Sequence, residues 1–386
     1  MSQPVPSRYH ALDSLRASMM FLGIVLHAMG AYSPMVPWLV RPLHTTKFFE
    51  PAILFIHAFR MPVFYAMAGF LTALLLERYG WRRAIVNRFW RIAVPFGLGC
   101  LLLVPLMFFL GAFARTGTAE GAWVFIVSGR FLSYAHPIHL WFLEYLLLLY
   151  ALAAVLVALT SLLPVKARST GLTLFRRGLQ SIWAPLPMAV LTFLTLLPMV
   201  WPGLQDPPSF APAPHILLAY AAPFFFGWLL YHARDLLDVL NRRAWLHGLL
   251  GVALCVAYVA LIYSIPPGDL RFYGLRAVLA LAMWCLIFGI TGLFLRYFSG
   301  HSPLWRYLCD SSYFIYLAHL PMILLLQLVT FNVALPAVVM VPVVLIGTTI
   351  VLLPVYAYAV RPTFVGALLN GRRYPVAIRP VAVSVT

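Results

Sequence analysis

The residues of this sequence that could do chemistry are ionisable side chains placed within long apolar runs. An ionisable group in the hydrocarbon of a membrane costs at least a few kcal/mol, so each one marks a candidate site. Histidine accepts a proton near neutral pH and arginine binds anions, so the set suits proton transfer or binding of an anionic substrate. Its members are Asp13, Arg16, His27, His57, Arg60, Glu144, Arg276 and His319, with His139 at the edge of a run.

The first run, LDSLRASMMFLGIVLHA, places Arg16 and His27 eleven residues apart. In a helix this spacing turns both side chains to one face, separated along the axis by about 16 Å. Asp13 precedes Arg16 by three residues and can pair with it. Gly23, one turn before His27, leaves room for a ligand or another helix to approach. The competing interpretations are a snorkelling Asp13–Arg16 pair at a helix end and a neutral core histidine with one hydrogen bond.

The second run, FIHAFRMPVFYAMAGF, places His57 and Arg60 three residues apart and therefore on one face. Pro62 removes a helical hydrogen bond at this point, as in broken membrane helices around binding sites. Arg60 has no acidic neighbour in its own helix. It therefore needs Glu144, Asp13 or an anionic ligand as its partner.

A later run begins HPIHLWFLEYLL, with His139 and Trp141 near its outer mouth. Glu144 follows about 7.5 Å deeper in the expected helix. One interpretation makes Glu144 catalytic. The other makes it a structural partner that neutralises Arg60 or Arg276.

The segment WRRAIVNRFWRIAVPF places Arg88 and Arg91 on one face at the inner surface. A pair of guanidinium groups of this kind suits the phosphates of a cytoplasmic ligand. The alternative is ordinary positive charge on the cytoplasmic side of a membrane protein. Together with His57, Arg60, His139 and Trp141, we expect these arginines and His319 to bind substrate.

The elements that must position these residues are membrane-spanning helices. The chain has 386 residues, of which 63% are apolar and 10% charged, and its mean hydropathy is +0.92. This composition excludes a soluble enzyme, a disordered chain and a disulfide scaffold. It predicts an all-α polytopic membrane protein with about ten spanning helices of ~20 residues. The expected spans are 12–32, 51–76, 92–113, 139–163, 183–201, 214–232, 246–265, 272–295, 312–331 and 336–360.

The distribution of positive charge predicts that both termini are cytoplasmic. With this orientation nineteen Lys and Arg lie on the cytoplasmic side and five on the outer side, alternating loop by loop. The same split accounts for the net charge of +17 without a nucleic acid partner. We expect a transmembrane domain over 1–360 and a loosely ordered cytoplasmic tail over 361–386. The loop 114–138 is expected to be re-entrant or interfacial, and the four scattered cysteines predict neither disulfides nor a metal site.

Five segments in the same order resemble the membrane-bound acyltransferase-3 family. They are RYHALDSLRA with the Arg16 and His27 spacing, FRMPVFYAMAGF, NRFWRIAVPF, HLWFLEYLL and SSYFIYLAHLP. The resemblance covers about residues 8 to 325, and the first two segments are most similar to the glucans biosynthesis protein C branch. The family's conserved Arg and His fall on Arg16 and His27, and its R-x-x-R motif falls on Arg88 and Arg91.

The resemblance implies an acyltransferase of the bacterial inner membrane. It would take an acyl group, expected to be succinyl, from cytoplasmic acyl-CoA and pass it to a hydroxyl of a periplasmic glucan. The chemistry needs a base for the hydroxyl proton, and His27 suits this role, either as general base or as carrier of a transient acyl-imidazole. Arg16, Asp13 and Glu144 complete the expected catalytic set.

Two other functions remain open at this stage. One is an O-acetyltransferase of another cell-surface glycan, and the other is a transporter of a glycan or organic acid that performs no chemistry. No permanently bound cofactor is expected, since acyl-CoA (succinyl-CoA above all) serves as donor substrate. The expected partners are the lipid bilayer, the glycan acceptor and glucan-synthesis proteins, with a homo-oligomer also compatible with the sequence.

Overall fold

The computed structural model describes residues 9–374 except 202 and 267–268. Within these residues every regular element is helical, which confirms the predicted all-α class. The α-helices, in chain order, are α1 (His10–Ala31), α2 (Glu50–Arg88), α3 (Val94–Thr116), α4 (Ala119–Val127), α5 (Trp141–Ser161), α6 (Val165–Gln180), α7 (Pro185–Leu196), α8 (Pro214–His232), α9 (Leu237–Arg242), α10 (Ala244–Ile262), α11 (Arg271–Tyr297), α12 (Pro303–Val329), α13 (Ala337–Pro354) and α14 (Phe364–Asn370).

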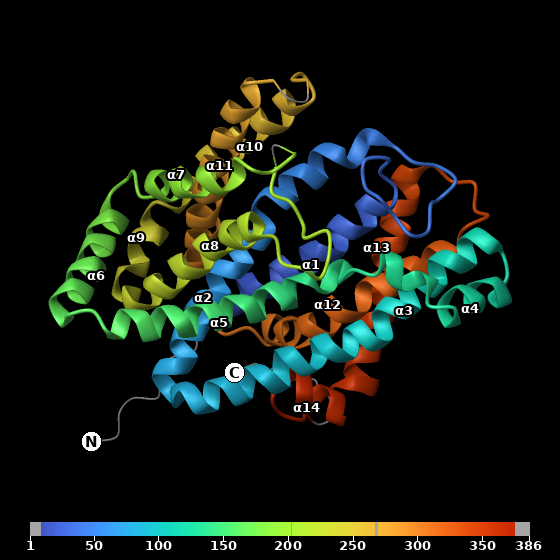
Figure 1. The fold of residues 1–386 in the computed structure, drawn as a ribbon, viewed down its shortest axis with the longest axis horizontal. Coiled ribbons are helices and arrows are strands. Elements are labelled where there is room, and N and C mark those ends of the chain that lie inside the picture. The colour runs from blue at the N-terminus through green and yellow to red at the C-terminus, as the bar shows by residue number, and fades with distance from the viewer. Residues whose placement is uncertain (1–8, 202, 267–268, 375–386) are drawn as a thin grey trace, which may run out of the picture.

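Eight helical stretches of the described chain are long and apolar enough to cross a membrane, or nine if the bent pair α6 and α7 counts as one. A multi-pass membrane protein is therefore confirmed, whereas the predicted number of ten is not. The longest stretch, Lys47–Thr116, contains both α2 and α3. Its helical path breaks at Gly80, where φ is 73° and ψ is 171°. Figure 1 shows α2 and α3 as two legs that run in different directions from this region, so the predicted segments 51–76 and 92–113 lie on separate legs.

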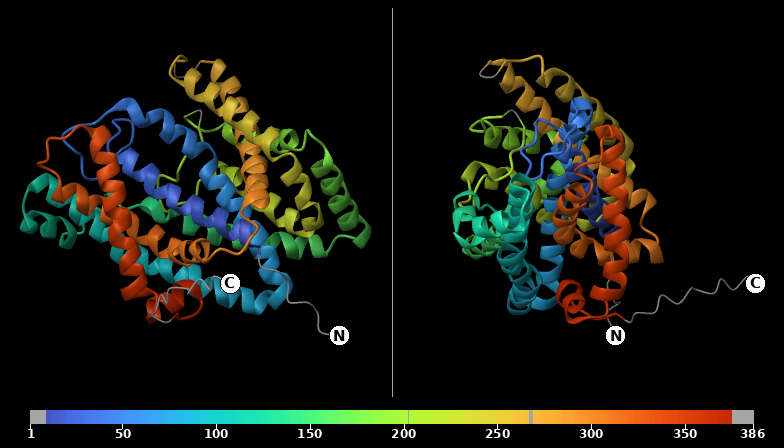
Figure 2. Two further views of the ribbon diagram at one scale, coloured as in Figure 1. Left: turned by 180° about the vertical axis from the view of Figure 1, so that it is seen from behind. Right: turned by 90° about the vertical axis from the view of Figure 1, so that its right-hand side faces the viewer.

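The prediction of one spanning helix over 183–201 is wrong. Helix α7 has only 12 residues, or about 18 Å of helix, which is shorter than the hydrocarbon core. Pro185 begins the helix, and Pro198 lies just beyond its end, where proline cannot continue it. The preceding segment, expected to be a loop, forms α6, which meets α7 at a bend of 109°. Helix α6 carries a charged face and lies at one edge of the molecule (Figures 1 and 2).

The boundaries of other elements differ from the prediction at three places. Helix α12 begins at Pro303 rather than at 312, because the Ser302 hydroxyl accepts a hydrogen bond from the Trp305 backbone N–H. The loop 114–138 contains the short helix α4, whose Trp123 is exposed. The expected loose tail contains α14, whose Leu369 carbonyl accepts hydrogen bonds from Arg91, and only its residues 375–386 lie outside the described chain.

The central helices pack with their backbones close together. Helices α1 and α2 run side by side through the middle of the molecule, with α12 against α1 and α8 against α2 (Figures 1 and 2). A Cβ added to Gly69 of α2 would overlap the Phe224 carbonyl of α8, and one added to Gly227 of α8 would overlap the Ala66 carbonyl of α2. Small residues permit this approach, and dispersion then supplies the attraction that lipid cannot. The α2–α8 pair therefore forms a rigid support for the residues that α2 presents to the interior.

We expect Gly227→Ala to destabilise the protein, because its Cβ would force α2 and α8 apart. Overpacking of a tight contact costs roughly 1–3 kcal/mol, which lowers the thermal unfolding temperature of the purified protein by several degrees. The matched control is Gly97→Ala in α3, where the added Cβ has no neighbour within 4 Å. The control should be neutral or stabilising, since alanine is the better helix former. Equal unfolding temperatures for the two variants would contradict the close packing of α2 on α8.

Candidate functional site

A charged cavity of about 470 Å³ lies at the end of the bundle where α1 and α12 begin. Six arginines and two aspartates line it, so its walls carry an excess of positive charge. The ionisable residues are Asp13, Arg16, Arg78, Arg88, Arg91, Arg306, Asp310 and Arg372. The lining residues Tyr9 and Tyr374 place both ends of the described chain beside this cavity. Such a cavity is chemically suited to a ligand with several phosphate groups.

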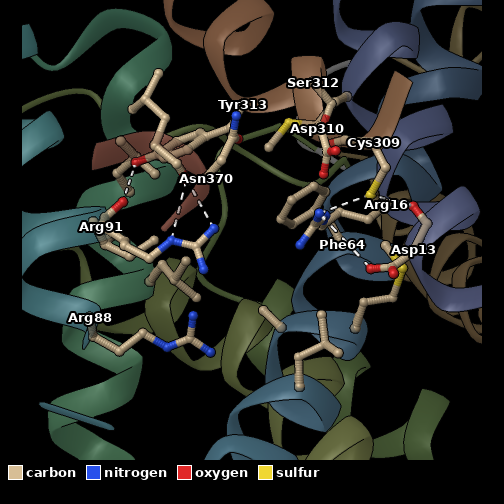
Figure 3. Close-up of a pocket in the computed structure, with 18 of the residues that line it drawn as sticks. Asp13, Arg16, Phe64, Arg88, Arg91, Cys309, Asp310, Ser312, Tyr313 and Asn370 are labelled. Carbon is tan, nitrogen blue, oxygen red and sulfur yellow. Dashed lines mark hydrogen bonds and ion pairs between the residues drawn. The ribbon is translucent and has the colours of Figure 1, made fainter. Parts of the chain in front are cut away.

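Arg16 is held in place on one wall of the charged cavity (Figure 3). Its guanidinium lies 4.0 Å from the Asp13 carboxylate, which confirms the predicted pair. Its Nη2 also lies 2.9 Å from Sγ of Cys309, whose thiol in turn lies 3.4 Å from the Asp13 carbonyl. These contacts fix the guanidinium so that it needs no rearrangement to meet an anion.

Arg88 and Arg91 line the opposite wall of the same cavity, as the sequence predicted (Figure 3). Arg88 donates to the Thr72 hydroxyl at 3.3 Å and lies 5.0 Å from the Tyr150 ring centroid. Arg91 sits in a π-helical turn, Phe89–Ala93, between α2 and α3. π-Helical turns are frequent at functional sites. The Arg91 side chain donates to the Leu369 carbonyl at the end of α14, so the C-terminal segment covers part of this wall.

Three histidines from distant parts of the sequence meet in the middle of the bundle. The ring centroids of His27 and His319 lie 5.2 Å apart, and those of His139 and His319 lie 5.3 Å apart. All three line a small central cavity of about 30 Å³. No group of three His, Cys, Asp or Glu in the described chain has the arrangement of a metal site. Imidazole groups that meet in this way suit proton transfer.

Backbone carbonyls orient two of these rings. Nδ1 of His319 lies 2.7 Å from the Tyr316 carbonyl and 3.1 Å from the Ile315 carbonyl, so in this tautomer Nδ1 carries the proton. Nε2 of His139 lies 3.2 Å from the Leu317 carbonyl in the same way. The other nitrogen of each ring, Nε2 of His319 and Nδ1 of His139, is buried and has no hydrogen-bond partner within the described chain. Each such nitrogen keeps a lone pair available to a substrate proton.

Arg60 and His57 also reach the central cavity, from α2. A Cβ on Gly23 would lie 2.5 Å from Nη1 of Arg60, so the predicted space beside Gly23 is filled by this guanidinium. Nε2 of His57 lies 2.9 Å from the Leu204 carbonyl and 3.8 Å from the Asp206 carboxylate. The segment that follows α7 therefore contributes to the site.

An aromatic cavity of about 680 Å³ opens at the other end of the bundle. The part of α1 that lines it begins at Leu26, whereas the charged cavity is lined by α1 only up to Met20. Its walls include the aromatic rings of Trp38, Trp141, Trp201 and Tyr258, together with His136 and Asp206. Flat aromatic faces combined with a few polar groups suit a polar ring such as a sugar.

The central cavity lies between the two larger ones. Its walls share Met20, Phe64 and Phe142 with the charged cavity. They share His27, His57, His139, Trp141 and Asp206, together with Leu26, with the aromatic cavity. The central cavity is therefore adjacent to both larger cavities, and the three shared apolar side chains lie between it and the charged cavity.

The structure places the predicted site residues in two groups, one at each of two cavities, and leaves one predicted residue outside all three cavities. Asp13, Arg16, Arg88 and Arg91 line the charged cavity, so the expected catalytic pair Asp13–Arg16 is separate from His27. His27, His57, Arg60, His139, Trp141 and His319 line the central cavity. Glu144 lines none of the three cavities.

Glu144 is also not the expected partner of an intramembrane arginine. Its Oε2 is buried without a hydrogen-bond partner in the described chain, and no ion pair joins it to Arg60 or Arg276. Arg276 instead donates to the Met199 carbonyl at 2.5 Å and lies over the Tyr273 ring. The prediction of Glu144 as a partner of Arg60 or Arg276 is therefore wrong, and Glu144 interacts electrostatically with Cys100 of α3 instead.

Several residues of the site were missed from the sequence. Cys309 and Asp310 were placed outside the membrane because the expected helix began too late, although the Ser302–Pro303 start signal was present. Asp206, Trp38 and Trp201 lie in loops, where no spacing rule marks them. Their place at the site is decided only by the folding of those loops over the bundle.

A comparison with family models shows what the chain is related to. The family described as acyltransferase domain, the acyltransferase-3 family, matches residues 9–358. Among curated proteins, those named glucans biosynthesis protein C from Salmonella gallinarum and Salmonella paratyphi B are each 28% identical over 333 residues, which cover 84% of this chain and 84% of each relative. No solved structure matches the chain. Because the match extends over nearly the whole described chain, the protein belongs to the acyltransferase-3 family of membrane acyltransferases.

Proposed function

We propose that this acyltransferase takes an acyl group, succinyl in the first instance, from acyl-CoA on the cytoplasmic side of the bacterial inner membrane. It transfers that group to a hydroxyl of a periplasmic glucan on the other side. The observation that supports this most strongly is the order of the cavities: the small cavity at His27 is adjacent to a charged cavity on one side and to an aromatic cavity on the other. The name of the relatives, glucans biosynthesis protein C, favours a glucan as acceptor.

The charge distribution supports the proposed orientation. The charged cavity lies among the loops that carry most of the positive charge, and such loops face the cytoplasm. Acyl-CoA is a cytoplasmic metabolite with several phosphates, so this is the side on which the donor arrives. Arg16, Arg88 and Arg91 then bind the phosphates from two walls.

The pantetheine arm of the donor can lead the thioester toward the histidines. Arg16 and His27 are about 16 Å apart along α1, and the pantetheine arm is a flexible chain of comparable length. The thioester carbonyl then lies beside His27, while the acceptor hydroxyl enters from the aromatic cavity. Each substrate keeps to its own side of the membrane.

In the proposed reaction His27 removes the proton of the acceptor hydroxyl as its oxygen attacks the thioester carbonyl. The new C–O ester bond forms, the C–S bond breaks, and the CoA thiolate leaves and takes up the proton. His139 and His319 line the same cavity, and each has one ring nitrogen without a hydrogen-bond partner in the described chain, so they can pass the proton along. The alternative is a transient acyl-imidazole on His27, which carries the acyl group between the two substrates.

The overall function is tested with the purified protein in lipid nanodiscs. We expect thioester consumption from succinyl-CoA that depends on added glucan, with the ester detected on the glucan by mass spectrometry. A transporter would bind or move glucan without consuming thioester, so unchanged thioester in the presence of glucan would refute the proposal. Acetyl-CoA in place of succinyl-CoA distinguishes the O-acetyltransferase alternative.

The donor site predicts that Arg88→Ala and Arg91→Ala weaken binding of coenzyme A, because each removes a guanidinium from the charged cavity. Loss of one such contact should raise Kd by about 10-fold at low salt and by less at high salt, where charge is screened. Calorimetric titration with coenzyme A at low and at high salt measures this Kd. The matched control is Arg83→Ala, on the same helix as Arg88, because Arg83 is exposed and does not line the charged cavity. Equal affinities of all three variants for coenzyme A would show that Arg88 and Arg91 do not bind the donor. They would then be part of the positive charge that is usual on the cytoplasmic side of membrane proteins.

The catalytic assignment predicts that His27→Asn abolishes acyl transfer while the protein still folds and binds coenzyme A. Asparagine keeps a hydrogen-bond donor but cannot take up a proton near neutral pH, so the rate should fall by at least ~10²-fold. Incubation with radioactive donor alone separates the two roles: an acyl-imidazole labels the wild-type protein, whereas a general base leaves it unlabelled. A variant with near wild-type rate would make His27 a core histidine and move the base to His139 or His319.

A further inference from the structure

Arg60 is a cation at the central cavity, and no carboxylate of the described chain pairs with it. Its Nε is buried with no hydrogen-bond partner, and none of the carboxylates in the described chain lies within ion-pair distance of its guanidinium. Asp206 attracts it from further away. That carboxylate is 52% exposed and lies 3.8 Å from His57 instead. The positive charge of the Arg60 guanidinium is therefore not compensated within the protein and can attract an anionic group that enters the central cavity.

The other groups that face Arg60 do not neutralise it. His27 and His319 are close enough to interact electrostatically, and protonation of either would add positive charge. The hydroxyls of Tyr220 and Tyr316 donate to the Gln205 and His139 carbonyls and therefore keep their protons. An isolated cation within the membrane is costly, so a site with this arrangement favours an anionic group in the bound state.

The position of Arg60 relative to His27 limits what that anion can be. Its Nη1 is pressed against Gly23, whose Cα is one helical turn before His27. One turn is about 5.4 Å, roughly the span of a short acyl chain between its reacting carbonyl and a second polar end. The bulky phosphates of the donor lie in the charged cavity, on the other side of Met20, Phe64 and Phe142.

We propose that Arg60 binds the free carboxylate of a dicarboxylic acyl group and thereby selects such donors over neutral ones of the same length. This inference rests on the proposed function and assigns a specificity-determining residue to it. A guanidinium fork binds a carboxylate through two parallel hydrogen bonds. With a neutral acyl chain the fork stays unpaired in a buried cavity, which penalises that donor.

The test compares donors with Arg60→Gln in nanodiscs. Succinyl-CoA and butyryl-CoA both carry four-carbon acyl groups, and only the first ends in a carboxylate. We expect the wild type to prefer succinyl-CoA in kcat/KM. In Arg60→Gln succinyl transfer should fall by roughly 10²-fold, the usual loss for a broken buried charge pair. Butyryl transfer should stay within a few-fold of wild type.

One further variant sharpens the comparison. Arg115→Gln is the matched control, because this exposed arginine lies outside the three cavities. It should leave both donors unchanged. Binding of coenzyme A to the charged cavity checks that each variant is folded.

If Arg60→Gln does not fold, Arg60→Lys provides the same test, since it keeps the charge and loses the fork. It should lower succinyl transfer partly and spare butyryl transfer. Equal losses for both donors would show that Arg60 serves the transition state or the fold, and a change confined to the KM of the glucan would assign it to the acceptor. Either result overturns the inference. Absence of transfer from any donor to the wild type would instead refute the proposed function.

Discussion

The cost of leaving charge and unpaired polar groups within a membrane shapes this protein. The Arg16 guanidinium contacts the Asp13 carboxylate and the Cys309 thiol. The Arg276 guanidinium donates a hydrogen bond to the Met199 carbonyl. The polar atoms of Arg60, His139 and His319 that lack partners gather instead around the central cavity. Such atoms are costly in hydrocarbon, so each of them marks a candidate functional group. The presence of three of them at one cavity supports this cavity as the place where a substrate reacts.

The helices make this gathering possible by packing tightly on one side of the site. Gly69 and Gly227 bring the backbones of α2 and α8 into contact, and Gly23 lets the Arg60 guanidinium lie against α1. These glycines remove side chains where close approach is needed, as membrane helices commonly do. The rigid α2 then holds His57 and Arg60 against α1, whose His27 completes the same wall.

The division into two large cavities and one small one fits the proposed reaction, whose two substrates differ in chemistry. Arginines of α1, α2 and α12 place positive charge at one end of the bundle. This charge would not contribute to binding a neutral sugar. Aromatic rings from loops and helix ends gather at the other, where they would not attract phosphate. The small central cavity lies between these two ends. In the proposed reaction the acyl group is the only part of the donor that has to reach the acceptor.

The sequence by itself determined the class of the protein and most of its helices. Composition and hydropathy suffice for this, because a chain so apolar must satisfy its backbone within helices in lipid. The eleven-residue spacing also put Arg16 and His27 on one face of α1, and the R-x-x-R spacing put Arg88 and Arg91 on one wall. Only the tertiary structure decided that His139 and His319 join His27, that Glu144 stays apart, and that Asp206 and Trp201 reach the site. Those choices depend on the rotation of each helix and the path of each loop, which are set by packing between distant segments and leave no periodic signal along the chain.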